Sequence, residues 1–533
     1  YRRQRQMCIR DRHNTSININ GNKGNVDTLN NQMTSQKKIQ RPSDDPVTAI
    51  RALRLRSTLS EIDQYYEKNI PDAESWLDVT ETAMTNMQEL IKTIRTQCEY
   101  GAQDSLTASN RKTILTQLEQ LRSKVYSEGN ADYAGRTVFT GYRTNKKITF
   151  MQDESTTKYE ITQKLSYSDL QEHRYYGNDI EVPKSQNELN NNMIASPTKA
   201  AYDRIRLGYD GIDSLDVTDA TGNTTKTSAN GSTVTISYNY TDTTGKTPVN
   251  KTGNMNVTVY DSYDKWLEAS TKTPKSYDIA DGEAVLIRDT GELIFSDAAS
   301  TTLSTNNASM DISYTKTGFD NGKLRPEYYY NCTNITDPNN TLKYEKYDKD
   351  GNQIYQDIDY VIAANQTLNV NTEASNVFDQ SLGRDVDELI DAVQRSLDAE
   401  QKVTDLEAMK KMDQYSSEKD QEKLDEWIAA AKKEQDYADD NMQKLYNSYI
   451  GNCDRYLEKV NLALTDVGTK GQSLALTKNR MSNQQETFEE LKSSNEDRDL
   501  SDIILDYIAA YTAYQSSLQA ASKINQTTLL SYL

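Results

Sequence analysis

Patterns typical of helices occur at both ends of the chain, and patterns typical of strands lie between them. Apolar residues recur at steps of three and four over about 44–125 and again from about 385 onwards, whereas short alternating runs rich in Thr, Asn, Gly and Tyr fill about 143–378. Helices at the two ends can pack on one another only if the middle is looped out between them. This order predicts an α+β fold, in which both chain ends form a long α-helical coiled-coil rod and a β-rich domain is inserted.

The first helical region has a recognisable start and one interruption. Residues 43–46 read Ser-Asp-Asp-Pro, which combines side chains that can cap a helix with a proline that suits a first turn. Pro71 cannot donate the i→i−4 hydrogen bond, so we expect it to kink or end the helix. Beyond it, spacing typical of a coiled-coil seam continues to a break at Gly101, after which a further helix is expected. That seam contains Leu77, Met84 and Ile91.

Several short runs in the middle region have the pattern of strands. Residues 232–240 and 254–260 alternate polar and apolar side chains, as half-buried strands do. Residues 283–295 and 344–355 each resemble a hairpin, with two short runs around a turn. The second turn contains an Asp-Gly pair ending at Gly351, which also raises a calcium-binding loop as an alternative. An EF-hand loop needs carboxylates at alternate positions and glycine at its sixth, so the spacing favours a type I′ turn.

The carboxyl-terminal region returns to helical spacing. One amphipathic stripe covers 386–397, a highly charged stretch at 408–448 is expected to be a helix with a solvated face, and a long helical run covers 446–491. The clearest seam of the chain follows, with alanines beside it that allow close approach of a second helix. Its members are Ile504, Tyr507, Tyr511, Tyr514, Leu518 and Ala521. An isolated chain would leave such stripes in water, so the pattern predicts assembly with a partner.

Composition excludes several classes of function. Lys and Arg number 61 against 80 Asp and Glu, a formal net charge of −19, so we expect no binding to nucleic acid. No apolar run approaches the roughly 18–20 residues of a membrane span, and no membrane insertion is expected. Two histidines and four widely spaced cysteines offer neither a zinc motif nor a disulfide framework. No catalytic motif is recognisable either, so we expect no enzyme activity, no cofactor and no metal site.

The first twelve residues differ from the rest of the chain. Residues 1–12 carry five arginines and one aspartate and do not begin with Met. A basic arm for nucleic acid or a targeting peptide is one interpretation. The interpretation we favour is a non-native leader, a segment foreign to the protein. An apolar signal segment with a small-residue cleavage site is not recognisable at this end, so export by the general secretory route is not expected.

Four segments match a known pattern. Residues 38–46, KIQRPSDDP, include Arg41, Pro42, Ser43, Asp44, Asp45 and Pro46. Residues 134–141, AGRTVFTG, include Gly135, Arg136, Phe139 and Gly141. The other two are Asp466-Val467-Gly468 followed by Asn479-Arg480, and the tail 522–533, which ends in Leu-Leu-x-x-Leu. These segments are similar to the K-x-x-R-P-S-D-D-P and G-R-Y-x-F-x-G patterns, the returning helix and the tail of the bacterial flagellin superfamily. More narrowly, the chain resembles the hook-associated protein 3 (FlgL) family of hook–filament junction proteins.

The resemblance implies three domains, two of which combine both ends of the chain. They would be a terminal coiled-coil domain at 13–45 and 500–533, a helical rod domain at 46–145 and 380–499, and an outer β-rich domain at 146–379. Two departures from the family pattern stand out. Residues 1–12 replace its usual Met-initiated start, and the charged stretch at 408–448 is longer than usual.

The resemblance also implies a structural role. The chain would form a ring with copies of itself, next to a neighbouring hook-associated protein and flagellin. It would be extracellular, exported unfolded by the flagellar type III system, and a cytoplasmic export chaperone would bind its carboxyl-terminal helix beforehand. The two seams, at residues 77–91 and 504–521, would be the subunit-packing surfaces.

Two alternatives share this organisation. Flagellin, the filament subunit, usually shows Ala rather than Pro after the acidic pair, so Pro42 and Pro46 count against it. A surface adhesin acting through the β-rich domain is the other. It stays open because the chain has 35 Tyr against 6 Phe, and tyrosine faces and hydroxyls suit glycans.

Overall fold

The computed structural model describes residues 2–103, 106–218, 224–242 and 249–526. Its contacts divide the chain into two compact units. The terminal unit comprises the described parts of Tyr1–Glu74, Asp359–Leu368 and Gly471–Leu533, and the central unit comprises those of Ser75–Ile358 and Asn369–Lys470. Within the described ranges, no helix combines the length and apolarity that a membrane crossing needs.

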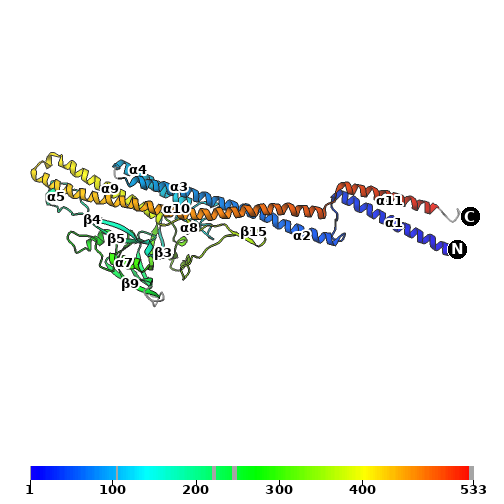
Figure 1. Ribbon diagram of the computed structural model, residues 1–533, viewed down its shortest axis with the longest axis horizontal. Helices are drawn as coiled ribbons and strands as arrows, with labels where there is room; N and C mark the ends of the chain where they lie inside the picture. The colour runs from blue at the N-terminus through cyan, green and yellow to red at the C-terminus, as the bar shows by residue number, and fades with distance from the viewer. Residues whose placement is uncertain (1, 104–105, 219–223, 243–248, 527–533) are drawn as a thin grey trace. The chain divides into compact units, whose positions relative to one another are not determined.

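The terminal unit is built mainly of helices. Figure 1 shows α1 and α11 side by side, with the amino and carboxyl ends of the chain at the same end of the pair. A small two-stranded ladder completes the unit. Its elements are α1 (Arg2–Ser35), α2 (Pro46–Asp63), a π-helical segment (Gln64–Asn69), β15 (Asp359–Ala363), β16 (Gln366–Asn369, whose last residue belongs to the central unit) and α11 (Leu500–Gln526). Two further helices, α3 (Ile70–Gly101) and α10 (Glu418–Glu496), have residues in both units.

The predicted start of the first long helix is confirmed. Asp45 is the N-cap of α2, and its carboxylate accepts from the backbone N–H of Val47 at 3.0 Å and of Thr48 at 3.3 Å. Pro46 is the first helical residue, where its missing N–H is not needed. The expected break at Pro71 takes the form of the π-helical segment, after which α3 begins at Ile70. Pro71 therefore lies in a first turn, where a proline is tolerated.

The central unit pairs helices from the two halves of the sequence. Its helices are α3, α4 (Ala108–Glu128), α9 (Ser381–Lys410) and the first part of α10. Arg95 on α3 binds Asp454 on α10 at 2.7 Å, and Arg111 on α4 binds Ser396 on α9 at 2.8 Å. The long helices from both ends of the chain therefore pack together, as the sequence predicts.

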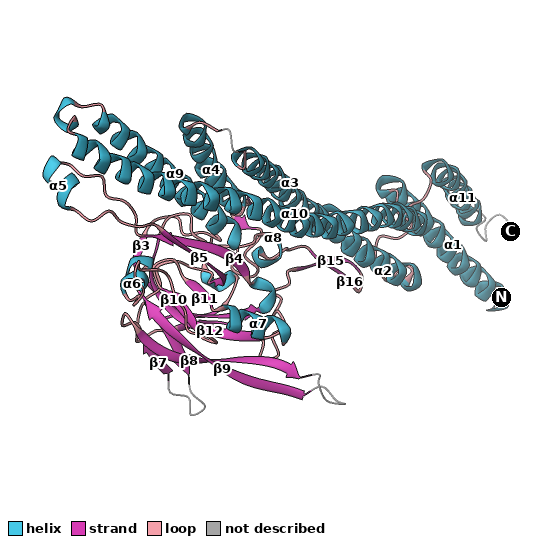
Figure 2. Cartoon of the chain, turned by 60° about the vertical axis from the view of Figure 1, so that its left-hand side comes forward, coloured by secondary structure: helices cyan, strands magenta, loops and turns pink. Residues whose placement is uncertain are grey.

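A β-sheet fills the interval between these helices in the sequence. The described strands form a twelve-stranded sheet with the order β14-β13-β3-β12-β8-β9-β10-β11-β5-β4, while β6 pairs with β12 and β7 (Figure 2). All pairs are antiparallel except β9 with β10. The strands are β3 (Glu154–Ser166), β4 (Gln171–Gly177), β5 (Thr198–Arg206), β6 (Ser214–Thr218), β7 (Thr224–Thr227), β8 (Ser232–Asp242), β9 (Val249–Tyr260), β10 (Ala284–Ile287), β11 (Glu292–Phe295), β12 (Ser309–Phe319), β13 (Asn331–Asn334) and β14 (Leu342–Tyr344). The inserted β-rich region is thus confirmed.

Short elements connect the strands. A two-residue hairpin is formed by β1 (Asp132–Tyr133) and β2 (Arg136–Thr137). The short helices are α5 (Gln186–Asn191), α6 (Tyr263–Glu268), α7 (Asp297–Thr305) and α8 (Ala374–Val377), with 3-10 turns at Tyr167–Asp169, Pro326–Tyr328 and Asp413–Tyr415. Figure 2 shows α6 and α7 next to the sheet.

The strand predictions are confirmed, one of them with a shorter pairing than expected. Residues 232–240 and 254–260 lie in β8 and β9, and 283–295 forms the β10–β11 hairpin with Gly291 in its turn at φ +61°. Residues 344–355 form a short hairpin around Gly351, at φ +85°, through an antiparallel bridge between Tyr347 and Gln353. The Asp348 N–H donates to the Asn352 carbonyl at 2.9 Å and the Ile354 N–H to the Lys346 carbonyl at 2.8 Å, whereas Tyr344 belongs to β14, which pairs with β13.

The prediction of a charged helix at 408–448 is confirmed from Glu418 onwards and is wrong before it. α9 ends at Lys410, a 3-10 turn follows, and α10 begins at Glu418. The chain reverses here because apolar side chains of both helices meet. The buried members of this cluster are Ile180, Leu189, Val403, Leu406, Met409, Tyr415, Leu424, Trp427, Ile428 and Ala431. Because so many residues of the stretch are charged, its narrow apolar face was not recognisable from the sequence.

Buried charges join the sheet to the helices of the central unit. Arg204 on β5 binds Glu292 on β11 and Glu388 on α9, both at 2.7 Å. Arg206, on the same strand, binds Glu388 at 3.1 Å and also pairs with Asp385. The sheet is therefore attached to α9 through paired ions, a kind of contact that requires every partner to be present.

The network fixes the protonation states of its members. Burial disfavours the charged form of Glu388, but the positive charges around it, Arg204 first, outweigh burial and hold its pKa well below the usual range. Burial, followed by the nearby Arg204, lowers the pKa of His173 on β4 to about 4. The Glu388 carboxylate is therefore charged and the His173 ring neutral at pH 7.

Candidate assembly surface

The contact between α1 and α11 follows the spacing of a coiled coil. Partly or fully covered positions recur at steps of four and three on both helices, so one stripe of each helix faces the other. On α11 they are Ile503, Tyr507, Ala510, Tyr514, Ser517 and Ala521, and on α1 they include Thr15, Ile19, Asn22, Val26, Leu29 and Met33. Of these only Ile503 is fully buried, and several are polar, so the pair has a thin apolar core.

A second stripe of α11 is apolar and points into solvent. Ile504 is 40% exposed, Ile508 56%, Tyr511 42% and Leu518 42%, with steps of four, three and seven between them. Leu505, at 65%, extends the same side. Exposed apolar side chains at regular helical spacing form a continuous stripe, which normally marks a surface that another chain covers. We call Ile504, Leu505, Ile508, Tyr511 and Leu518 the outer stripe.

The structure divides the predicted carboxyl-terminal seam between these two stripes. Tyr507, Tyr514 and Ala521 belong to the stripe that faces α1, whereas Ile504, Tyr511 and Leu518 belong to the outer stripe. The rings of Tyr507 and Tyr511 stack with their centroids 6.0 Å apart, which links the two stripes. Sequence reasoning missed Leu505 and Ile508, although the step of four from Ile504 to Ile508 was a usable signal.

The amino-terminal seam lies elsewhere. Leu77 is 3% exposed, and Met84 and Ile91 are fully buried inside the central unit. Their side chains pack within this one chain, as a helix-bundle core requires. Contact of these three residues with a neighbouring subunit stays a prediction.

A charged joint connects the end of α10 with the linker between α1 and α2. Glu496 is 3% exposed, and its carboxylate accepts from Arg56 of α2 through two hydrogen bonds of 2.6 and 2.7 Å. Lys37 lies 3.5 Å from Glu496 and also pairs with Asp497. The hydrogen bonds from Arg56 hold the pKa of Glu496 below its usual value, so the joint is charged at neutral pH.

Backbone hydrogen bonds complete this joint. The Lys38 N–H donates to the Glu496 carbonyl at 2.7 Å, and the Arg498 N–H donates to the Gln36 carbonyl at 3.0 Å. Gln36 adopts a positive φ of +56°, which turns the chain at the end of α1. The segment that follows α1 and the segment that joins α10 to α11 thus pair over a short stretch beside the α1–α11 pair. No sequence signal marks this joint, because its members are about 440 residues apart.

The first family-motif segment is the linker that follows the joint. Arg41, Pro42, Ser43 and Asp44 are exposed, and the Asp44 carboxylate accepts from the backbone N–H of Arg41 at 2.9 Å. Asp45 and Pro46 begin α2. The motif therefore folds the turn between α1 and α2, with two carboxylates bound to backbone N–H groups.

The second motif segment is a compact turn in the central unit. Gly135, at φ +79°, lies in the β1–β2 hairpin, and Gly141, at φ +59°, approaches the side chain of Gln356 too closely for any Cβ. Arg136 lies over the Trp76 ring, 5.0 Å from its centroid. Phe139 is fully buried, and its ring meets Phe378 edge-on. These residues shape the chain between α4 and the sheet.

The described residues offer nothing with which to hold a metal ion. None of their His, Cys, Asp and Glu side chains form a group of three or more with suitable placement. The candidate functional features among the described residues are the outer stripe of α11 and the charged joint at Glu496.

Comparison with known proteins finds similarity over part of the chain. The model of the bacterial flagellin N-terminal helical region matches residues 11–144. Flagellar hook-associated protein 3 of Salmonella typhimurium is 27% identical over 117 residues, which are 22% of this chain and 37% of that protein. Flagellar hook-associated protein 3 of Escherichia coli is 30% identical over 120 residues, 21% of this chain and 36% of that protein. The chain thus spans a little over a third of the length of these curated relatives.

Solved structures add a distant likeness. The crystal structure of Xanthomonas campestris FlgL aligns with 83% of this chain and 99% of its own, at 11% identity and a TM-score of 0.30. A score this low carries no argument about function. The sequence matches show that residues 11–144 are similar to the helical region at the amino end of bacterial flagellins, and that part of the chain is similar to flagellar hook-associated proteins 3.

Proposed function

We propose that the chain is a structural subunit of the bacterial flagellum and forms part of the junction between hook and filament. The proposal rests on the two sequence relatives, both flagellar hook-associated proteins 3, and on the outer stripe of α11. The flagellin family is a family of structural proteins, so a role in packing rather than catalysis follows.

The outer stripe is the observation that carries the proposal. Covering one large apolar side chain contributes about 1.5–3 kcal/mol, so five exposed ones represent a substantial unused driving force for association. The α1–α11 pair itself buries little, which leaves its stability dependent on a further partner. An assembly of parallel subunits would supply that partner in the form of neighbouring helices.

The neighbours follow from this role. The chain would contact copies of itself in a ring, a second hook-associated protein on one side and flagellin on the other. It would act outside the cell after export by the flagellar type III system. The same outer stripe would suit an export chaperone, because a free amphipathic helix needs its apolar side covered before assembly. The acidic net charge of −19 makes nucleic acid an unsuitable partner.

Flagellin is the second candidate, and the relatives count against it. Both curated matches are hook-associated proteins rather than filament subunits. For the adhesin alternative, the described residues of the β-sheet provide no specific observation in its favour.

The test is binding to isolated flagellar hooks from a bacterium that lacks hook-associated protein 3. We expect the full chain to sediment with the hooks, because the outer stripe becomes covered there. Tyr511→Asp and Ile508→Asp should abolish sedimentation by placing a charge in that contact. Ala513→Asp is the matched control, because Ala513 is exposed on the side of α11 opposite Ile504. Failure of the full chain to bind, or equal binding by Tyr511→Asp, would contradict the proposal.

A further inference from the structure

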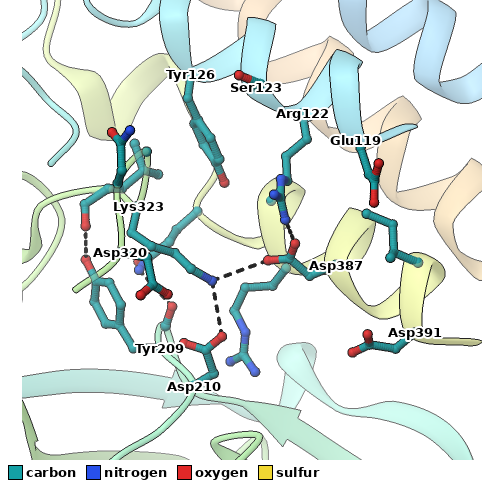
Figure 3. Close-up of a pocket in the computed structure, with 18 residues that line it drawn as sticks. Glu119, Arg122, Ser123, Tyr126, Tyr209, Asp210, Asp320, Lys323, Asp387 and Asp391 are labelled. Atoms are coloured by element: carbon teal, nitrogen blue, oxygen red, sulfur yellow. Dashed lines mark hydrogen bonds and ion pairs between the residues drawn. The ribbon is translucent and has the colours of Figure 1, made fainter. Parts of the chain in front are cut away.

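A cleft lies between the sheet and α9 in the central unit. Its volume is about 810 Å³. Tyrosines from the sheet side line one wall, namely Tyr176, Tyr263 and Tyr277, and α9 and α10 provide the other. A neighbouring cavity of about 740 Å³ shares Asp387 and Asp391 with it (Figure 3). Neither cavity has a role in the assembly described above.

The side chains that line the cleft include more carboxylates than positively charged groups. Eight carboxylates and three arginines line it. Some of the carboxylates have partners: Figure 3 shows Asp387 joined to Arg122 and to Lys323, the latter at 3.3 Å. Three others, Asp264, Asp289 and Asp391, make no hydrogen bond or ion pair with any described side chain. In Figure 3 the Asp391 carboxyl group stands apart from the Arg122–Asp387 pair.

A buried polar side chain also faces the cleft without a partner. Asn441 of α10 is 9% exposed, lines the cavity and makes no hydrogen bond with the described residues. Its amide atoms reach the cleft rather than being sealed in the interior, so their hydrogen-bonding capacity is open to whatever occupies the cleft. A ligand in the cleft would provide a partner. His173 of β4, equally buried, lines the opposite wall with a neutral ring.

The pKa of Asp391 reflects its burial and the charges around it. Burial, and then the Glu388 carboxylate, raise the pKa of Asp391 above its usual value, and Asp210 and Asp289 act in the same direction. Arg395 opposes them but does not offset them. Burial is the larger cause of the shift, and the three neighbouring carboxylates, Glu388, Asp210 and Asp289, add negative charge at this wall of the cleft, which favours a cation.

We propose that this cleft binds a small organic cation with two or more ammonium groups, the chemistry of a linear polyamine. Asp289 and Asp391 would pair with ammonium groups, and the Asn441 amide oxygen would accept from one. The rings of Tyr263 and Tyr277 would contact the alkyl chain and its charge, because Arg395 already covers the Tyr176 ring, 4.1 Å from its centroid. A bare metal ion fits less well, since no described group of carboxylates is arranged to hold one. This inference does not depend on the proposed role in the flagellum.

Calorimetric titration of the full chain with spermidine tests the proposal. We expect saturable binding at one site, weakened about fivefold by Asp391→Asn and similarly by Asp289→Asn, the effect of removing one partly screened ion pair. Asp405→Asn is the matched control, because this exposed residue of α9 bonds only to Gln401 of its own helix. Circular dichroism of each variant verifies that the fold is intact.

The outcomes are distinct. Loss of affinity in both cleft variants and not in Asp405→Asn supports the site. Absence of saturable heat with the wild-type chain overturns it. Equal weakening by all three variants also overturns it, because that result means general attraction to an acidic surface. Magnesium chloride at equal ionic strength should not compete more strongly than sodium chloride, and stronger competition by magnesium would assign the cleft to a metal ion instead.

Discussion

The terminal helix pair and the central unit bury opposite kinds of side chain. Among the described residues of the α1–α11 pair, one apolar residue is fully buried and six large apolar residues of α11 are exposed. In the central unit, apolar side chains fill the core and even arginines such as Arg204 are buried at 2% exposure among paired carboxylates. A unit that satisfies its charges internally can fold alone, whereas one that leaves an apolar stripe in water is completed by a partner.

The largest expected effect comes from breaking the buried network. Arg204→Ala leaves Glu292 and Glu388 charged and buried without their main partner, so the central unit should lose about 3–5 kcal/mol of unfolding free energy. Urea denaturation followed by tryptophan fluorescence measures this loss. Arg174→Ala is the control, because its pair with Asp440 is partly exposed and should contribute about 1 kcal/mol or less. Equal losses in the two variants would remove the distinction between buried and surface pairs.

Truncation of apolar side chains compares the two regions directly. Ile91→Ala removes a fully buried side chain and should lower the unfolding free energy of the monomer by about 2–5 kcal/mol. Ile508→Ala makes the same change on the outer stripe, and its effect on the dilute monomer should stay within about 0.5 kcal/mol. Denaturation of both variants under identical conditions gives the comparison. A large loss for Ile508→Ala would mean that the outer stripe is already covered in the monomer.

Acid should weaken the central unit through His173. Its pKa is about 4 in the folded chain and near 6.5 when unfolded, so between these values the unfolded state binds the additional proton. Stability is therefore full above pH 6.5 and falls by up to about 3 kcal/mol as the pH drops to 4. Denaturation at pH 7, 5.5 and 4 measures the slope. His173→Gln should flatten it, and His13→Gln, at an exposed position of α1, should leave it unchanged.

The smallest expected effect concerns the joint. Arg56→Gln removes the paired hydrogen bonds to Glu496 but leaves Lys37 nearby, so we expect a loss of about 1 kcal/mol, confined to the terminal unit. The readout is faster hydrogen exchange at the Lys38 amide, which donates to the Glu496 carbonyl. Arg54→Gln, at a neighbouring exposed position, is the control. Unchanged exchange in Arg56→Gln would show that the backbone bonds alone hold the joint.

The sequence predicts the architecture well, because periodicity and order determine it. The cap at Asp45 and the strands at residues 232–260 follow from local rules that the rest of the chain does not override. The reversal at residues 411–417 was missed, since the surrounding charges mask a stripe as narrow as Leu424, Trp427 and Ile428. The hairpin at 344–355 forms around the predicted turn, but its pairing is short, because Tyr344 belongs to β14 and pairs with β13 instead.

The surfaces were harder to predict than the fold. Helical spacing locates apolar residues near the end of α11 but cannot say which stripe α1 covers, since adjacent stripes differ by one residue, as Ile503 and Ile504 do. The joint at Glu496 and the cleft at Asp391 unite residues that are distant in the sequence, and nothing local marks either of them. Such sites depend on tertiary packing.

Hydrogen exchange of the dilute full-length monomer tests the central claim most directly, namely that the terminal helix pair is incomplete without a partner. We expect amides of α1 and α11 to exchange with little protection while those of α3 and α9 are strongly protected, and hook binding to slow exchange in α11. Equal protection of α11 and α9 in the monomer would contradict the account, because the helix pair would then be a stable domain that needs no partner.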